Sequence, residues 1–395
     1  MNQANSIIYL DNAATTPMHP QVVEVMADIM TNTYGNASSV YSVGQAAKFQ
    51  LESARESVAK SLNCLPQEVY FTGCGSEADN WAIKGYAMAN RQKGNHIITT
   101  QIEHHAVLHP CEYLEKNGFE VTYLPVDETG LVSLEDVKNA IRDNTILISV
   151  MYANNEVGTI EPIQEIAKIA KEHGICMHTD AVQAVGAEPI DFKDLGVDML
   201  SLSAHKFNGP KGVGALLVRK GLRLDSLMHG GAQERSKRAG TENLAGIMGL
   251  AKALELAVTD LPKKQEKIRA MRDYLIAQIE ENIPYIKFNG HREKRLSNNV
   301  NFCFRYIEGE SLLLMLDING ICASSGSACT SGSLDPSHVL LALGLPHEIA
   351  HGSLRLSLSL NTTKEEIDYT VSKLKEIVHR LRLMSPIYDM SLEEN

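Results

Sequence analysis

The feature that most constrains the fold is the regular alternation of short apolar runs with helix-like patterns between residues 68 and 219. Strands that alternate with helices are joined by crossover connections, and they form a mostly parallel sheet with helices on both faces. The strand-like runs are Glu68–Thr72, His96–Thr100, Glu120–Pro125, Ile146–Tyr152, Ile175–Asp180, Met199–Ser203 and Val213–Arg219. Binding sites in such sheets lie just beyond the carboxyl ends of the strands. We therefore expect a large α/β domain with its functional groups along that edge.

The pattern changes after residue 219, where a glycine-rich loop leads into two long helical patterns and then into a mixture of single strands and helices. A chain of 395 residues is long enough for two or three domains. We expect residues 16–261 to form the large α/β domain and residues 1–15 and 262–395 to form a smaller α+β domain.

Charge and composition exclude several kinds of partner. The net charge is -11 at pH 7 and no basic run stands out, which argues against nucleic acid and against an anionic membrane surface. No apolar run approaches the ~20 residues of a membrane-spanning helix, and the first residues lack the basic region of a secretory signal. Seven cysteines without a Cys-x-x-Cys pair favour a reducing compartment over a disulfide framework or a zinc site. We expect a cytoplasmic protein.

Lys206 is the first candidate for chemistry. It follows the strand Met199–Ser203, it is flanked by Ser203 and His205, and glycines and a proline break regular structure directly after it. A lysine held at a strand end becomes a nucleophile for Schiff-base formation when burial lowers its pKa. Taken alone, this stretch fits an exposed lysine in a loop better. The polar groups that follow other strands make the chemical interpretation of Lys206 the better one.

Those polar groups are a carboxylate, two amides and an imidazole. Asp180 ends a strand, where it either keeps a protonated heterocyclic nitrogen cationic, so that the ring is an electron sink, or caps the next helix. Gln183 and Asn155 either place amide donors at the same rim or form simple turns. His104 either stacks on a ring and relays protons or caps a helix.

Three further features are candidates for chemistry. The turn Gly73–Glu77, with Gly75 and Ser76, is either a phosphate cradle before a helix or a tight turn, and it is neither a Walker loop nor the three-glycine dinucleotide fingerprint. Cys329 is a candidate nucleophile because the loop around it is almost wholly small and polar. Arg355 is a single charge in an alternating apolar strand, so it either binds a substrate carboxylate or reaches the surface.

Four stretches together resemble the NifS/IscS-type cysteine desulfurases, which are fold-type I pyridoxal phosphate (PLP) enzymes. They are Tyr9–Thr16, His178–Gln183, Ser203–Lys206 and Ser324–Cys329, and they occur in the family's order over nearly the whole chain. The resemblance implies an aspartate aminotransferase-like fold and a homodimer with active sites at the subunit interface.

The resemblance also implies a role for each candidate. Lys206 would carry PLP as a Schiff base, Asp180 would pair with the ring nitrogen, and His104 would stack on the ring and act as an acid and base. Asn155 and Gln183 would donate to the phenolic oxygen. Arg355, with Asn155, would bind the carboxylate of the substrate. Cys329 would accept the sulfur. The phosphate would be bound by Gly75, Ser76, Ser203, His205 and, from the other subunit, Thr241.

The activity implied is the removal of sulfur from L-cysteine, which gives L-alanine and a persulfide on Cys329. The sulfur acceptor would be a protein such as an iron–sulfur scaffold, because the tail Leu381–Met390 resembles the segment with which the family contacts that partner. A selenocysteine lyase, a desulfurase dedicated to selenium or tRNA thiolation, and a non-enzymatic sulfur carrier are alternatives. The turn Gly73–Glu77 departs from the family's usual Ser-Gly-Ala-Thr-Glu.

Overall fold

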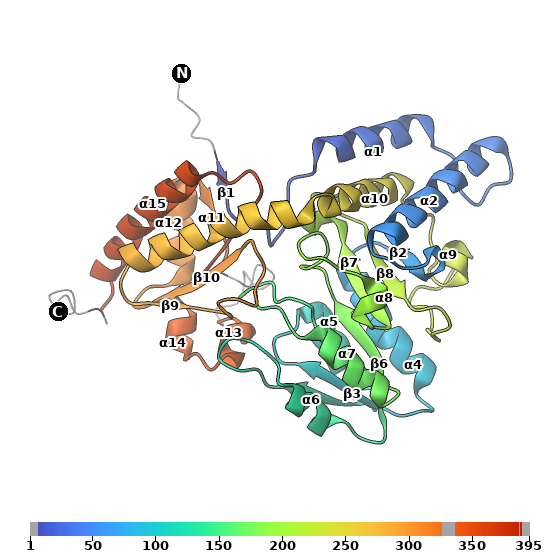
Figure 1. Cartoon of the computed structure of the whole chain (residues 1–395), viewed down its shortest axis with the longest axis horizontal. Coiled ribbons are helices and arrows are strands. Elements are labelled where there is room, and N and C mark those ends of the chain that lie inside the picture. The colour runs from blue at the N-terminus through green and yellow to red at the C-terminus, as the bar shows by residue number, and fades with distance from the viewer. Residues whose placement is uncertain (1–6, 326–335, 387, 389–395) are drawn as a thin grey trace.

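A seven-stranded sheet organises the larger part of the molecule (Figure 1). The computed structural model describes residues 7–325, 336–386 and 388. The sheet has the order β2-β8-β7-β6-β5-β3-β4, and its strands are parallel except β8, which is antiparallel to both of its neighbours. The strands are β2 (Val69–Thr72), β3 (His96–Thr100), β4 (Glu120–Leu124), β5 (Thr145–Ser149), β6 (Cys176–Asp180), β7 (Met199–Ser203) and β8 (Gly214–Val218).

Helices cover both faces of this sheet. One group is α1 (Pro20–Asn32), α2 (Ser42–Ser61), α7 (Ile163–Glu172) and α10 (Leu244–Val258), and the other is α3 (Gly75–Asn80), the π-helical turn Trp81–Gly85, α4 (Tyr86–Asn90) and α5 (His105–Glu115). Successive strand residues alternate between the two groups. Ile98 and Leu200 pack with the first group, whereas Ile97 and Met199 pack with the second. Burial on both faces explains why the strands read as continuous apolar runs.

A second core surrounds a three-stranded antiparallel sheet of order β12-β10-β9. Its elements are β9 (Ile286–Phe288), β10 (Asn299–Phe304), β12 (Ser353–Ser357), α11 (Leu261–Asn282), α12 (Gly309–Ile318) and α15 (Lys364–Leu383). The long helix α11 extends from the end of α10 to this sheet (Figure 1). The N-terminal strand β1 (Ile8–Tyr9) joins the second core by parallel pairing with β11 (Ile321–Cys322), and Ile8 and Leu10 are buried in it.

Short helices complete the described chain, namely α6 (Leu134–Ala140), α8 (Phe192–Leu195), α9 (Gln233–Ser236), α13 (His338–Ala342) and α14 (His347–Ala350).

The region of α9 is conformationally unusual because Glu234, Arg235 and Ser236 have φ of 45°, 57° and 63°. A buried ion pair holds it in place. Both Oε atoms of Glu234 accept from the Arg55 guanidinium, at 2.7 and 2.8 Å, and one also accepts from the Phe71 N–H.

The prediction of a mostly parallel sheet followed by a smaller α+β part is confirmed, and the strands β3 and β7 begin and end at the predicted residues. The strand expected to reach Tyr152 ends at Ser149, because the chain bends into a turn in which Asn154 Oδ1 accepts from two backbone N–H groups. The strand β9 and the helices α8, α9 and α14 were not expected. The domain limits at residues 15/16 and 261/262 stay a prediction.

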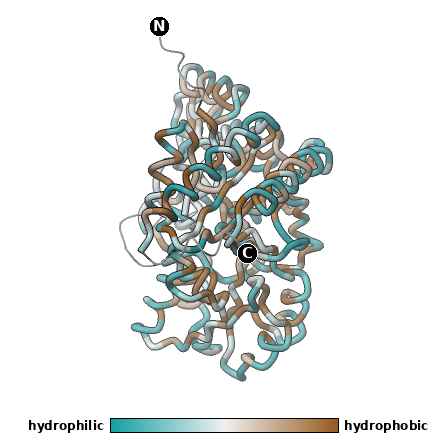
Figure 2. The backbone as a smooth tube through the Cα atoms, turned by 90° about the vertical axis from the view of Figure 1, so that its left-hand side faces the viewer, coloured by the Kyte–Doolittle hydropathy of each residue, from teal (hydrophilic) through white to brown (hydrophobic). Residues whose placement is uncertain are grey.

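The distribution of hydropathy agrees with this layering. Figure 2 shows hydrophilic segments along the outer helices and loops, and hydrophobic segments through the interior. Of the helices in the described residues, none has both the length and the apolar content that crossing a bilayer requires.

Candidate active site

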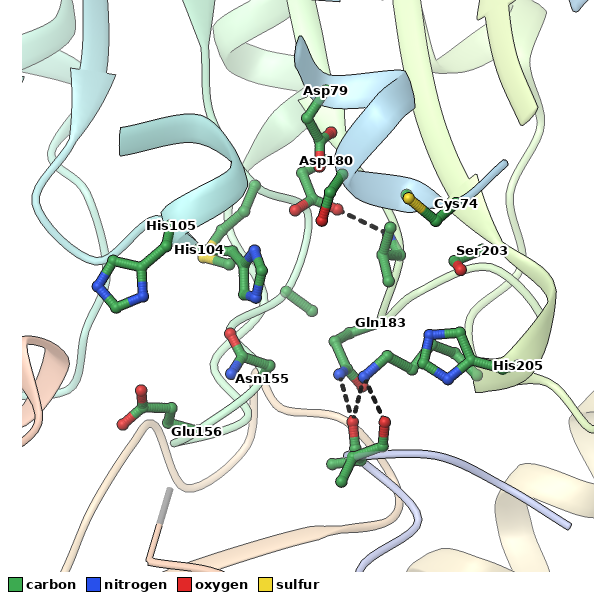
Figure 3. A pocket seen from close by; sticks show the side chains of 18 of the residues that line it. Cys74, Asp79, His104, His105, Asn155, Glu156, Asp180, Gln183, Ser203 and His205 are labelled. Atoms are coloured by element: carbon green, nitrogen blue, oxygen red, sulfur yellow. Dashed lines mark hydrogen bonds between the residues drawn. The ribbon is translucent and has the colours of Figure 1, made fainter. Parts of the chain in front are cut away.

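A cavity of about 270 Å³ lies at the carboxyl edge of the seven-stranded sheet (Figure 3). The predicted residues that line it are Gly75, Ser76, His104, Asn155, Asp180, Gln183, Ser203, His205, Lys206 and Arg355. All of them except Arg355 come together because β2, β3, β5, β6 and β7 end at this edge. Thr241 is exposed and does not line the cavity of its own chain. Cys329 lies outside the described residues.

Lys206 ends the 3-10 turn Ala204–Lys206 that follows β7. Its Nζ donates to the carbonyl oxygens of Ala13 and Ala14, at 2.6 and 3.0 Å, and Gln183 Nε2 also donates to Ala13 O, at 2.9 Å. The loop after β1 therefore forms one wall of the cavity, and the amine is half-buried against that wall. The interpretation of Lys206 as an exposed loop lysine is wrong.

Asp180 lies at the end of β6 and is 6 % exposed. Burial raises the pKa of this carboxyl from 3.8 to about 6, and the Val182 N–H, which donates to Asp180 Oδ1 at 2.9 Å, and the positive charge of Lys206 oppose that rise. The chain after Asp180 forms turns and no helix before α8, so the helix-capping interpretation is wrong. One oxygen accepts the backbone bond of that turn while the side chain faces the cavity (Figure 3).

A second buried acid, Asp79 on α3, lies beside Asp180 (Figure 3). Burial, and then the charge of Asp180, raises the pKa of Asp79 well above its usual value. The neighbouring His178 does not neutralise it, because burial lowers the pKa of His178 to about 3. Two adjacent buried carboxyls cannot both ionise cheaply. Of the two carboxyls, Asp79 therefore gives up its proton less readily, and Asp180 is the one that ionises more readily.

Asp79 is a residue that sequence reasoning missed. The sequence contained a clue, because an acid at position 79 stands close to two apolar residues, Ala78 and Trp81, that belong to the apolar core. The partners of His178 were also unforeseen. Ser149 Oγ lies 2.8 Å from His178 Nδ1 and Ser201 Oγ lies 3.0 Å from Nε2.

His104 caps the N-terminus of α5 and also lines the cavity. Its Nδ1 accepts from the Ala106 N–H at 3.0 Å, so the proton of the neutral ring is on Nε2. Burial, and then the charge of Lys206, lowers the pKa of His104 to about 4. The imidazole is therefore neutral near pH 7. Two further imidazoles, those of His105 and His338, line the same cavity.

One end of the cavity is suited to an anion. Ser203 Oγ is buried and accepts or donates no hydrogen bond within the described structure. Gly75 lies opposite, and a Cβ atom there would be 2.7 Å from Val182 Cγ2 and 3.3 Å from Ser203 Cβ. The absence of a side chain thus leaves the backbone open beside an unsatisfied hydroxyl. A phosphate with several acceptor oxygens would supply the missing partner.

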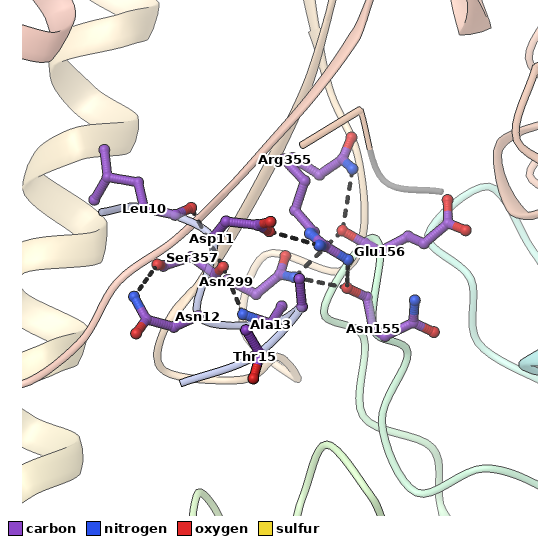
Figure 4. A network of polar contacts seen from close by, with 12 residues as sticks. Leu10, Asp11, Asn12, Ala13, Thr15, Asn155, Glu156, Asn299, Arg355 and Ser357 are labelled. Carbon is purple, nitrogen blue, oxygen red and sulfur yellow. Dashed lines mark hydrogen bonds and ion pairs between the residues drawn. The ribbon is translucent and has the colours of Figure 1, made fainter. Parts of the chain in front are cut away.

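Arg355 on β12 approaches the cavity from the second core (Figure 4). Only 1 % of the residue is exposed, so the interpretation in which it reaches the surface is wrong. Its Nη2 pairs with Asp11 Oδ1 at 2.8 Å and its Nη1 donates to Asn155 O at 3.0 Å. Asp11 was not singled out by sequence reasoning, although it lies in one of the four family-like stretches.

Comparisons with known proteins agree with this geometry. The family model described as aminotransferase class-V matches residues 8–370. The chain is 58% identical over 387 residues to the cysteine desulfurase IscS of Clostridium botulinum, and the match covers 98% of each protein. The chain belongs to the class-V aminotransferase family, among its cysteine desulfurases.

Solved structures extend the similarity to the fold of this cysteine desulfurase. A NifS-like protein superposes with a TM-score of 0.90 at 40% identity, covering 95% of this chain and all of the other. A structure described as SspA in complex with cysteine superposes with a TM-score of 0.80 at 38% identity, covering 90% of this chain and 100% of the other. Membership of the class-V family implies PLP as the cofactor.

Proposed function

We propose that the cavity binds PLP at Lys206 and that the enzyme uses it to remove sulfur from L-cysteine, giving L-alanine and leaving the sulfur on Cys329. One observation carries the proposal. An amine, a buried carboxyl, a neutral imidazole and an unsatisfied hydroxyl, at Lys206, Asp180, His104 and Ser203, face one cavity in a member of the cysteine desulfurases.

Each of these groups suits one part of the cofactor. Lys206 would hold the aldehyde carbon covalently, and ionised Asp180 would pair with the protonated ring nitrogen. His104 would lie against the ring, and Ser203 with Gly75 would hold the phosphate. When bound, PLP supplies an electron sink for the charge that develops at the substrate Cα.

The protein's own groups move and hold the protons. Lys206 Nζ is the base for the Cα proton, and the carbonyls of Ala13 and Ala14 keep that amine at the cavity wall when it is not bonded to the cofactor. His104 Nε2–H is directed by the bond that Nδ1 makes to the Ala106 N–H, so it donates a proton or receives one back at a defined position. Asp180 is the carboxyl of the buried pair that ionises more readily, because burial and the charge of Asp180 raise the pKa of Asp79 well above its usual value.

Arg355 would bind the carboxylate of L-cysteine. Its guanidinium is held in place by Asp11 and Asn155 O, which leaves a planar fork oriented by protein contacts before substrate arrives. The choice of L-cysteine rests on the family and on the cysteine complex of the similar SspA structure.

The attachment points of the segment with Cys329 support its role as sulfur acceptor. Ser324, before residues 326–335, forms an antiparallel bridge with Arg355. His338, after them, lines the cavity and lies on α13. Both ends of the segment are therefore next to the place where the substrate sulfur would be.

The wider context follows from the same proposal. We infer a homodimer in which Thr241 of the partner subunit adds a phosphate contact, and a protein acceptor for the sulfur, such as an iron–sulfur scaffold. We further infer that the enzyme works in the cytoplasm.

Two variants test the proposal together. Lys206→Ala, supplied with PLP, should lack the Schiff-base absorption band near ~400 nm and should release no alanine or sulfide from L-cysteine. Cys329→Ala should keep that band, respond to L-cysteine spectrally, and lose nearly all turnover. Cys64→Ala, remote from the cavity, is the matched control and should behave as wild type. Normal alanine production by Cys329→Ala would disprove the role of Cys329, and an unchanged band in Lys206→Ala would disprove the whole proposal.

A further inference from the structure

Cys74 has a position that the proposed reaction does not use. Among the cysteines in the described residues it is the one whose side chain is exposed, the others being buried or half-buried. It also lines the cavity, directly before Gly75 (Figure 3). A thiol that is both accessible and inside a binding cavity is open to chemical modification.

The loop around Cys74 is held rigidly. Glu77 Oε2 accepts from the Gly73 N–H at 2.7 Å, and Glu77 Oε1 is paired with Arg238 Nε at 2.7 Å. The Thr72 hydroxyl donates to the Cys74 carbonyl at 3.0 Å, and Cys74 Sγ accepts from the Glu77 N–H at 3.4 Å. The sulfur therefore has a defined place on the cavity wall.

An independent observation shows that a ligand belongs beside this sulfur. Ser203 Oγ is buried and has no hydrogen-bond partner within the described residues, and Ser203 is 2 % exposed. It faces the position of Gly75, where even one added methyl group would approach Val182 and Ser203 too closely. The backbone at residue 75 is thus open to a ligand because it has no side chain, and an acceptor-rich group such as phosphate would satisfy the hydroxyl.

We propose that Cys74 is a modification site for low-molecular-weight disulfides, and that its modification and the binding of the cofactor's phosphate exclude each other. The inference rests on the proposed function for the identity of that phosphate. The group attached to Cys74 Sγ takes the space beside Ser203 and Gly75, so a modified enzyme cannot load its cofactor, and a loaded enzyme is protected.

The reaction is thiol–disulfide exchange and needs no further oxidant. The Cys74 thiolate attacks one sulfur of the disulfide, a new S–S bond forms at Cys74, the old S–S bond breaks, and the other half leaves as a thiolate. L-Cystine, the disulfide of the proposed substrate, is the probe of this class. A reducing thiol reverses the exchange and restores the free Cys74.

The test uses the full chain with the cofactor removed, and with the cofactor restored. Both forms are treated with L-cystine, and modification is followed peptide by peptide by mass spectrometry. We expect Cys74 to react about tenfold or more faster in the cofactor-free form, and inorganic phosphate alone to slow the reaction. Cys64 is the internal reference, because burial raises the pKa of its thiol to about 12 and its rate should not depend on the cofactor.

Cofactor loading is the second measurement. L-Cystine-treated protein should fail to develop the absorption band near ~400 nm until a reducing thiol is added, whereas Cys74→Ser should load equally with or without prior L-cystine. Equal Cys74 reactivity in both forms, or normal loading of the modified protein, would overturn the inference. Failure of the proposed function looks different, because untreated, reduced wild type would then fail to load PLP as well, while protection of Cys74 by inorganic phosphate would still report on the anion site.

Discussion

Asp180→Asn should stabilise the cofactor-free enzyme while weakening its hold on PLP. The reason is the environment of the carboxyl, which is buried and lies beside a second buried acid, Asp79. Burial raises the pKa of Asp180 from 3.8 to about 6. This difference is worth about 3 kcal/mol of folding free energy, at 1.36 kcal/mol for each pKa unit.

Proton linkage determines whether the carboxyl stabilises or destabilises the folded protein at a given pH. The folded state binds the Asp180 proton more tightly than the unfolded state, so the contribution to stability is full below pH 3.8 and is lost as the pH rises through about 6. Above pH 7 the folded protein therefore carries a buried charge that the Val182 N–H and the charge of Lys206 compensate only in part. An asparagine has no such charge, and its amide oxygen still accepts from the Val182 N–H, as Asp180 does now.

Thermal unfolding of the cofactor-free proteins measures the effect. An unfolding entropy of about 2.1 cal/mol/K per residue over the chain converts 3 kcal/mol into a Tm increase of about 3 to 4 °C for Asp180→Asn at pH 8. The two proteins should differ little at pH 4. Saturating PLP should raise the Tm of wild type more than that of the variant, because only the carboxylate pairs with a protonated ring nitrogen. A variant that is no more stable than wild type at pH 8, or an advantage that persists at pH 4, would refute the reasoning.

Three more variants probe the same contacts. Arg355→Lys keeps the charge but loses one bond of the guanidinium fork, so kcat/KM for L-cysteine should fall about 10- to 100-fold, mainly through KM; an unchanged KM would contradict carboxylate binding. His104→Gln should lower kcat by about 10²- to 10⁴-fold. Because the pKa of His104 is lowered to about 4, wild type should show no inflection from this residue between pH 6 and 8, and its kcat/KM profile is the check. Glu234→Gln removes the buried counter-charge of the Arg55 guanidinium and leaves it the exposed Glu52 carboxylate at 3.3 Å, so unfolding should cost about 3 kcal/mol less and Tm should fall by several degrees. The control Glu120→Gln, in an exposed ion pair, should change Tm little.

The sequence by itself determined the element order and the edge at which the site lies. The strands His96–Thr100 and Met199–Ser203 were predicted to the residue, because a strand buried on both faces must be apolar throughout and is bounded by polar turns. Polar side chains that follow parallel strands meet at one edge of the sheet. The positions of Asp180, His104 and Lys206, each at or just after the end of a strand, are therefore enough to group them in one site.

Only the tertiary structure decided which groups those side chains contact. Lys206 donates to the carbonyls of Ala13 and Ala14, which lie more than 190 positions away in the sequence. Every residue except proline has the same backbone donor and acceptor, so no side-chain pattern announces such a bond. The raised pKa of Asp79 is likewise a property of the fold, because the pKa of a carboxyl depends on burial and on its neighbours in space. A sequence specifies which groups are present, and the packing of distant segments sets the distances and the dielectric that determine their chemistry.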